Sequence, residues 1–373
     1  MRSRVLHIIP ALIQGGAEKL LFDLVSRSPK IDMKVITLLA DPPFFPLDAR
    51  FLDSLAMQRG RLSPRLLWRL RAKINEFRPD LIHAWLYHGN LFSLAAAGLS
   101  IPIVWSIHNT TLSAEHSKKL TRLANRLCAR LSRRMPARIV YCAASAREVH
   151  ERIGYDPARG LVIENGIDLE AFAFDGAARG RIRREIGLAT EDYAVGSVAR
   201  FDPQKNHRLL VEAFARAGLG ERARLVLAGR GCTAENPQLT QWLDEFGVRE
   251  RTVLFGQRHD VPAVLSALDL LVSASAYGEA MPLAIIEAAA VGLPVITTDV
   301  GDARALVLDP ADVVAPATAD SMAAAICRVR AHSDAPDLAQ RKLARRDRIA
   351  RDFSLAGTIA RYHDLYRTLA LPA

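Results

Sequence analysis

The sequence lacks several features that mark particular classes of protein. No hydrophobic run reaches the roughly 18 residues that a membrane-spanning helix needs. Only four cysteines occur, and their spacing fits neither a zinc site nor a disulfide framework. We therefore expect a reducing compartment and four buried, unreactive thiols, namely Cys128, Cys142, Cys232 and Cys327.

Signals for secretion and for nucleic-acid binding are also missing. The apolar part of Arg2–Ile13 is too short for a signal peptide, and Gly15–Lys19 stands where a cleavage site would be. The net charge is +10, but the basic clusters show no zinc spacing, no helix-turn-helix signal and no aromatic interleaving. We expect a cytoplasmic protein that does not bind nucleic acid.

What is present is a long, alternating pattern of strands and helices. A chain of 373 residues, half of them hydrophobic, exceeds one ordinary core and predicts two domains. The alternation predicts an α/β fold with parallel sheets, whose ligands gather at the carboxyl ends of the strands. We read 172–181 as a loose linker. The expected strands are 5–9, 34–39, 81–84, 103–107 and 138–142, then 194–199, 225–228, 252–255 and 268–273.

A pair of carboxylates stands out in the second half. Glu279 and Glu287 lie eight positions apart, and Pro282 between them is expected to begin a helix. At about 1.5 Å per residue the carboxylates are on the order of 12 Å apart along the axis. That separation suits the two ends of an elongated ligand, with free helix N–H groups near its negative middle. A solvated helix also produces such pairs.

The pair and the following Gly292–Thr298 resemble the motif of the retaining glycosyltransferases of family 4, which have the GT-B fold. The resemblance implies two Rossmann-like domains facing each other across a cleft, at 1–165 and 166–352, and a helix at 353–373 that crosses back to the first domain. Asn165–Asp168 is similar to the signature at the family's domain junction. The implied reaction moves a sugar from UDP or GDP to a hydroxyl of a lipid-linked or surface glycan.

The resemblance also implies how the donor diphosphate is held. Arg200 and Lys205 match the family's diphosphate-binding cations. The chain contains no Asp-x-Asp motif, with which many sugar transferases hold a divalent metal. We therefore expect no metal and no cofactor, because the two cations and the helix N–H groups near the segment Met281, Pro282 and Leu283 neutralise the leaving group.

The remaining roles follow from the same resemblance. Glu287 would hold the ribose, Glu279 and His108 the transferred sugar, Gly15 and Gly16 the phosphates, and Arg258 and Arg230 the nucleotide base. Ala280-Met281 replaces the family's Gly-Phe, which puts the sugar specificity in doubt. The expected loop 83–90, rich in stacking and hydrogen-bonding groups, suits the acceptor.

Two other functions remain open, a nucleotide-sugar epimerase of the same fold and a non-catalytic nucleotide-sugar-binding subunit. Basic clusters at 59–78 and 118–138 are either solvated faces or a surface for an anionic membrane, which would hold the protein at the inner face. In the second cluster, one helical face carries basic residues and another carries leucines. The basic set is Arg122, Arg126, Arg130 and Arg134, and the apolar set is Leu120, Leu123, Leu127 and Leu131.

Overall fold

The computed structural model describes residues 3–58, 63–110 and 119–370. The chain divides into two compact units. Unit 1 is Met1–Gly166 with Ala356–Ala373, and unit 2 is Ile167–Leu355. Three basic residues of the clusters noted in the sequence, Arg59, Arg61 and Lys118, lie outside the described residues.

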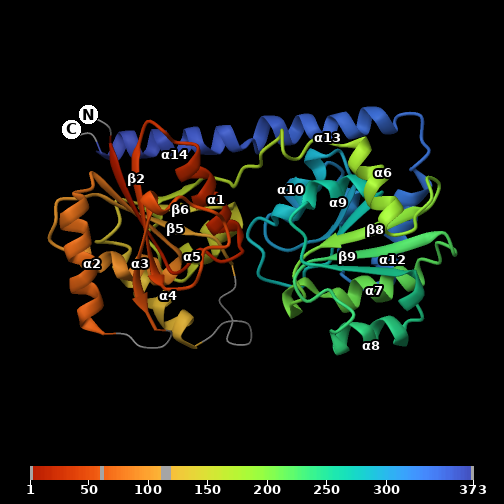
Figure 1. Cartoon of the computed structure of the whole chain (residues 1–373), viewed down its shortest axis with the longest axis horizontal. Helices are drawn as coiled ribbons and strands as arrows, with labels where there is room; N and C mark the ends of the chain where they lie inside the picture. Colours follow the sequence, from red (N-terminus) through yellow and green to blue (C-terminus); the bar gives the residue numbers. More distant parts are fainter. Residues whose placement is uncertain (1–2, 59–62, 111–118, 371–373) are drawn as a thin grey trace. The chain divides into compact units, whose positions relative to one another are not determined.

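Unit 1 is built on a seven-stranded sheet in the order β3-β2-β1-β4-β5-β6-β7, with every described pairing parallel (Figure 1). Strands β4 and β5 are buried along their whole length, as expected where helices cover both faces of a parallel sheet. The strands are β1 (Arg4–Ile9), β2 (Asp32–Leu39), β3 (Leu52–Met57), β4 (Leu81–Trp85), β5 (Ile103–Ile107), β6 (Arg138–Tyr141) and β7 (Gly160–Val162). The helices are α1 (Gly16–Ser26), α2 (Pro64–Phe77), α3 (Leu86–Phe92), α4 (Lys119–Leu131), α5 (Ala144–Arg152) and α14 (Leu355–Ala370).

The last helix, α14, packs against unit 1. Its Tyr366 hydroxyl lies 2.6 Å from Nδ1 of His83 on β4, and its His363 lies 2.7 Å from the Ser28 hydroxyl. Thr358 donates a hydrogen bond to the carbonyl of Glu164 at 3.0 Å. Helix α14 therefore completes the core that the first 166 residues begin.

Unit 2 has a six-stranded sheet in the order β10-β9-β8-β11-β12-β13, again with parallel pairings. Helices α6, α9, α10 and α13 lie on one side of this sheet, and α7, α8 and α12 lie on the other (Figure 1). The strands are β8 (Tyr193–Val198), β9 (Ala223–Ala228), β10 (Thr252–Gly256), β11 (Leu270–Ser273), β12 (Val295–Thr298) and β13 (Val313–Val314). The helices are α6 (Gly176–Glu185), α7 (His207–Arg216), α8 (Pro237–Glu245), α9 (Val261–Ala267), α10 (Leu283–Ala290), α11 (Ala303–Leu306), α12 (Ala319–Ala331) and α13 (Leu338–Asp352).

Both strand orders reverse direction once, and these reversals locate the ligand sites. In unit 1 the chain builds outward from β1 through β2 to β3 and then resumes on the other side with β4. In unit 2 the reversal lies between β8 and β11. Ligands of open parallel sheets bind outside the carboxyl ends of the strands at such a switch point.

Three expectations from the sequence are wrong. The segment 172–181 is not a loose linker, because Asp175 caps helix α6 by accepting hydrogen bonds from the N–H groups of Ala177 and Ala178. The segment 83–90 is not a loop, since it ends β4 and begins α3. Cys327, on α12, is exposed rather than buried.

Helix α4 carries the leucines that the sequence placed on one helical face. Leu120, Leu123 and Leu127 are exposed. The buried side of the helix is made of smaller residues, Ala124, Asn125, Cys128 and Ala129. Small side chains allow α4 to approach the rest of unit 1 closely, which leaves the larger leucines outside.

Candidate functional site

The loops after β8 and β11 meet at the switch point of unit 2. Lys205, from the loop after β8, forms an ion pair through Nζ with Oε1 of Glu279, which follows β11. The Ser275 hydroxyl donates a hydrogen bond to the same carboxylate oxygen at 2.8 Å. Glu279 is 8% exposed, so protein groups such as these two partners, rather than water, stabilise its charge. The structure thus brings together two of the residues that the sequence assigned to the donor.

A capped turn holds Lys205 in this position. Asp202 accepts a hydrogen bond from the N–H of Gln204 at 3.0 Å and thereby begins the short 3₁₀ turn Pro203–Lys205. Asn206 then adopts the left-handed conformation, with φ of 49°, and α7 follows. The N–H of Ala276 donates to the carbonyl of Gln204 at 2.8 Å. This bond ties the loop after β11 to the loop after β8 and fixes the distance between the cation and the carboxylate.

Arg200 lies exposed beside this pair. Its Nε is 3.2 Å from Asp202 and its Nη2 is 3.1 Å from the side-chain oxygen of Gln204. These contacts orient the guanidinium but leave it accessible to a ligand. The backbone of Gly229 lies close to that of Ala199, just after β8. A side chain at Gly229 would collide with the carbonyl of Ala199.

Helix α10 begins next to Glu279. We expected Pro282 to be its first helical residue, whereas the structure has Pro282 as the N-cap and begins the helix at Leu283. Pro282 supplies no side-chain cap, and α10 begins after the loop that follows the carboxyl end of β11. Met281 is buried, and Glu287 is half-buried one turn into the helix.

The loop that carries Glu279 is packed against another loop from β12. A side chain at Gly301 would collide with the carbonyls of Glu279 and Ala280, and the N–H of Asp302 donates to the carbonyl of Ala280 at 2.9 Å. Gly301 has a φ of 63°, which also favours glycine. This position therefore tolerates no side chain without moving Glu279.

The two arginines assigned to the nucleotide base differ in their surroundings. Arg258 forms ion pairs with Asp260 at 2.7 Å and with Glu185 at 2.8 Å, and it covers the ring of Phe255. These hydrogen bonds hold the pKa of Asp260 down at about 2. Arg230 is exposed just after β9. Both arginines therefore lie at the carboxyl ends of strands. Arg258, unlike Arg230, is already held by ion pairs with Asp260 and Glu185 of the same unit.

In unit 1 the glycine loop follows β1 at the switch point. Gly15 is the N-cap of α1, and Gly16 is its first residue. The carboxylate of Glu18 folds back over Gly15, so that a side chain there would collide with it. Burial raises the pKa of Glu18 to about 7. The loop assigned to phosphates thus carries an acid that is partly protonated at neutral pH.

His108 follows β5 and stacks on Trp85, with ring centroids 5.3 Å apart. Burial lowers its pKa to about 4, so the imidazole is neutral at pH 7. Within the described part of the chain, neither ring nitrogen has a hydrogen-bond partner. An uncharged ring with unused donor and acceptor capacity suits recognition of a neutral hydroxyl group.

Sequence reasoning overlooked the residues that support these side chains. Ser275, Gln204 and Gly301 each act on Glu279 or on its loop, and Glu18 occupies the glycine loop. Ser275 could have been found from the sequence, because it lies four residues before Glu279 in the same motif. Gly301 could not, because only the fold shows that it approaches the backbone of Glu279 and Ala280.

Two family profiles match successive parts of the chain. Residues 14–171 match the profile described as Glycosyltransferase Family 4, and residues 192–332 match the one described as Glycosyl transferases group 1. The chain belongs to the family 4 glycosyltransferases. The family predicted from the paired glutamates is confirmed, as are the transferase class and the GT-B type of fold, two Rossmann-like parallel-sheet domains.

Relatives of this transferase cover most of its length. It is 28% identical to the glycosyltransferase EpsF of Bacillus subtilis over 80% of this chain and 79% of that protein. It is 27% identical to an Escherichia coli UDP-Gal:alpha-D-GlcNAc-diphosphoundecaprenol alpha-1,3-galactosyltransferase, over 77% and 75% of the two chains. Among solved structures, HepE of Anabaena in complex with UDP and glucose matches with a TM-score of 0.82 and 19% identity, over 98% of this chain and all of that one.

Proposed function

We propose that this glycosyltransferase moves a sugar from UDP or GDP to a hydroxyl of a lipid-linked or surface glycan, with retention at the anomeric carbon. The observation that carries the proposal is the contact of Lys205 with Glu279 beside Arg200 at the switch point of unit 2. In a nucleotide-sugar the diphosphate is bonded directly to the sugar. Lys205, proposed to bind the diphosphate, likewise lies next to Glu279, proposed to bind the sugar. The UDP-galactose donor and lipid-linked acceptor of the Escherichia coli relative support the same substrate classes.

The proposed chemistry uses cations in place of a metal. As the bond from the anomeric carbon to the diphosphate oxygen breaks, that oxygen gains negative charge, which Arg200 and Lys205 neutralise. The acceptor oxygen bonds to the anomeric carbon from the same face, and its proton passes to a donor phosphate oxygen. Glu279 orients the sugar, Glu287 the ribose, and His108 a sugar hydroxyl, while Gly15 and Gly16 receive the phosphates. No enzyme residue forms a covalent bond.

Calorimetric titration with UDP, GDP and ADP in EDTA tests the donor site. We expect one nucleotide to bind tightly to the wild type without metal. The Arg200→Ala/Lys205→Ala variant should bind that nucleotide at least about tenfold more weakly, since two charge-assisted contacts are lost. Circular dichroism of the variant controls for folding, because the change leaves Glu279 buried without its cation.

Two results would contradict this account. Binding that appears only when a divalent metal replaces EDTA would refute neutralisation by cations alone. A folded wild type that binds none of the three nucleotides would refute the donor site. Product analysis with and without a glycan acceptor separates a transferase, which needs the acceptor, from an epimerase, which does not.

We also propose that unit 1 binds the cytoplasmic face of an anionic membrane through α4. Within the described residues, no helix combines the length and hydropathy that a membrane crossing needs. Helix α4 instead exposes Leu120, Leu123 and Leu127 next to Arg126 and Arg130. Exposed leucines beside arginines are typical of helices that lie in a membrane interface, where each basic residue adds on the order of 1 kcal/mol.

Cosedimentation with vesicles containing phosphatidylglycerol tests this surface. The Leu123→Glu/Leu127→Glu variant should lose vesicle binding, because two carboxylates oppose both insertion and the anionic surface. Neutralising Arg122, Arg126, Arg130 and Arg134 together should weaken binding and remove its salt dependence. Unchanged binding of both variants would show that α4 is not the contact. The matched control is Arg184→Gln, which changes a basic residue of unit 2.

A further inference from the structure

Unit 2 contains a pocket of about 740 Å³ at the edge of the sheet opposite to the donor site. Its walls include Asp269, just before β11, and Leu293 and Pro294, just before β12. Glu279 lies beyond the other end of β11, so the two sites flank the same strand. The size of the pocket falls in the range of about 300–1,000 Å³ that is usual for small-molecule sites.

The charged groups that line the pocket are unequally paired. Five are basic, namely Arg179, Arg328, Arg341, Lys342 and Arg345, and three are acidic, namely Asp269, Asp309 and Asp312. Each carboxylate already has a partner: Arg179 binds Asp269 at 2.7 Å, Arg328 binds Asp312 at 2.7 Å, and Asp309 accepts from the N–H of Ala311 at 2.8 Å. Arg341 also has a partner, Asp337, at 2.7 Å.

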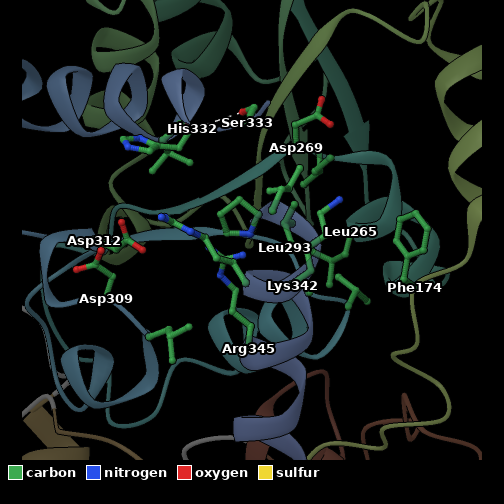
Figure 2. A pocket seen from close by; sticks show the side chains of 18 of the residues that line it. Phe174, Leu265, Asp269, Leu293, Asp309, Asp312, His332, Ser333, Lys342 and Arg345 are labelled. Atoms are coloured by element: carbon green, nitrogen blue, oxygen red, sulfur yellow. Dashed lines mark hydrogen bonds between the residues drawn. The ribbon is translucent and has the colours of Figure 1, made fainter. Parts of the chain in front are cut away.

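Two cations remain, Lys342 and Arg345, both on α13. Neither has an ion pair within 4.0 Å among residues 3–58, 63–110 and 119–370. Figure 2 shows both between Asp309 and Asp312 on one side and Phe174 on the other. The Nζ of Lys342 lies 6.0 Å from the ring centroid of Phe174.

Arg345 is the less exposed of the two. Its Nη1 is buried and has no hydrogen-bond partner within the described part of the chain. Burial also lowers the pKa of Arg345, although Asp312 and Asp309 nearby act in the opposite direction. A buried guanidinium nitrogen without a partner costs free energy that a bound anion would recover.

Other lining residues indicate the rest of the ligand. Leu265, Leu293 and Pro294 provide an apolar surface, while Ser333 and His332 add hydroxyl and imidazole groups. Two cations without an ion pair among the described residues match the double charge of a phosphate monoester, which is about −1.5 to −2 at pH 7, better than they match a single carboxylate. This combination of apolar and hydrogen-bonding groups suits a compact molecule that carries several hydroxyl groups.

We propose that this pocket binds a small phosphate monoester with a body of about the size of a sugar, held through its phosphate by Arg345 and Lys342. The site is separate from the diphosphate site of the donor. Its binding does not depend on the proposed transferase reaction, because it involves neither Arg200 nor Glu279.

Calorimetric titration with glucose 6-phosphate, inorganic phosphate and glucose tests the proposal on the full chain. We expect the ester to bind most tightly, inorganic phosphate more weakly, and glucose not measurably. Lys342→Glu should raise the Kd for the ester about tenfold or more, since it replaces an attractive charge by a repulsive one. Arg345→Gln should weaken binding similarly if it folds, but Lys342, being exposed, gives the safer test.

Two controls locate the bound ester. Arg351→Glu reverses a charge on the same helix outside the pocket and should leave the Kd unchanged. Arg200→Ala should leave it unchanged as well. Loss of ester binding in Arg200→Ala, with retention in Lys342→Glu, would mean that the phosphate binds at the donor site and would overturn the proposal. Absence of any ester binding to the wild type would also overturn it.

A final arm distinguishes the source of the phosphate. Vesicles containing phosphatidic acid carry the same phosphate monoester on a lipid. Vesicle binding that Lys342→Glu abolishes, together with failure of the soluble esters to bind, would overturn the assignment to a small metabolite. Soluble ester binding that vesicles do not compete away would support it.

Discussion

Replacing Arg200 by alanine will lower kcat by about a hundredfold or more, which is the usual effect of removing one donor that stabilises transition-state charge. Arg200 is exposed and is oriented by Asp202 and Gln204, so alanine removes the guanidinium without opening the core. Because charge on the leaving diphosphate grows as the sugar bond breaks, we expect kcat to fall more than KM rises. Steady-state kinetics with the nucleotide-sugar identified by calorimetry would measure both.

The matched control for this measurement is Arg208→Ala. Arg208 is also an exposed arginine of unit 2 and forms two hydrogen bonds with Glu245, at 2.6 and 3.2 Å. Losing such a surface pair costs at most about 1 kcal/mol of stability, so kcat should stay near the wild-type value. A kcat for Arg200→Ala that equals that of the control would remove Arg200 from the mechanism. A rise in KM alone would make it a residue of substrate binding.

The parallel sheets could be predicted because their strands are buried on both faces. Segments such as 103–107 and 270–273 are nearly continuous apolar runs, and the strands found there differ from the expected ones by at most two residues. Strand β3 was missed because it lies at the edge of its sheet and contains Asp53 and Ser54. Helix α6 was missed because its sequence is rich in arginine and has little apolar periodicity, although Asp175 was a usable capping signal.

The candidate site could be assembled from the sequence only in part. The sequence shows that Arg200 and Lys205 follow one expected strand and that Glu279 follows another. The rule that ligands bind at a switch point of a parallel sheet predicts that such loops lie together. The ion pair of Lys205 with Glu279 joins residues 74 positions apart and depends on the order of the strands, which the sequence does not state. The sequence also could not show that Lys342 and Arg345 lack ion-pair partners among the described residues. In the sequence, α13 is only a basic stretch.

The second large effect that we expect is acid unfolding of unit 1 near pH 5. Three histidines of this unit, His7, His83 and His150, are buried and His108 is half-buried, and desolvation lowers the pKa values of all four from the ordinary 6.5. The pKa falls to about 3 for His7, to about 4 for His108 and His150, and well below its usual range for His83. As the pH falls below 6.5, the unfolded chain binds protons that the folded unit cannot bind, so stability decreases.

The free energy lost through these histidines is large enough to unfold unit 1. At pH 5 the three histidines whose pKa falls to about 3 or 4 have each cost about 2 kcal/mol, since one pH unit corresponds to about 1.4 kcal/mol per group. Their combined loss of about 6 kcal/mol is comparable to the whole stability of an ordinary domain, about 5–15 kcal/mol, and His83 acts in the same direction. Hydrogen exchange measured by mass spectrometry between pH 7 and pH 4 separates unit 1 from unit 2. Unit 1 should lose its protection first.

His108→Phe tests the cause. His108 makes no hydrogen bond within the described residues and stacks on Trp85, a contact that phenylalanine preserves. Removing one of four titrating groups should move the unfolding midpoint of unit 1 down by about half a pH unit. His332→Asn changes an exposed histidine of unit 2 and should leave that midpoint in place. If both variants unfold at the wild-type pH, the buried histidines do not set the acid limit, and ionisation of carboxylate pairs such as Lys73–Asp53 would be the next cause to examine.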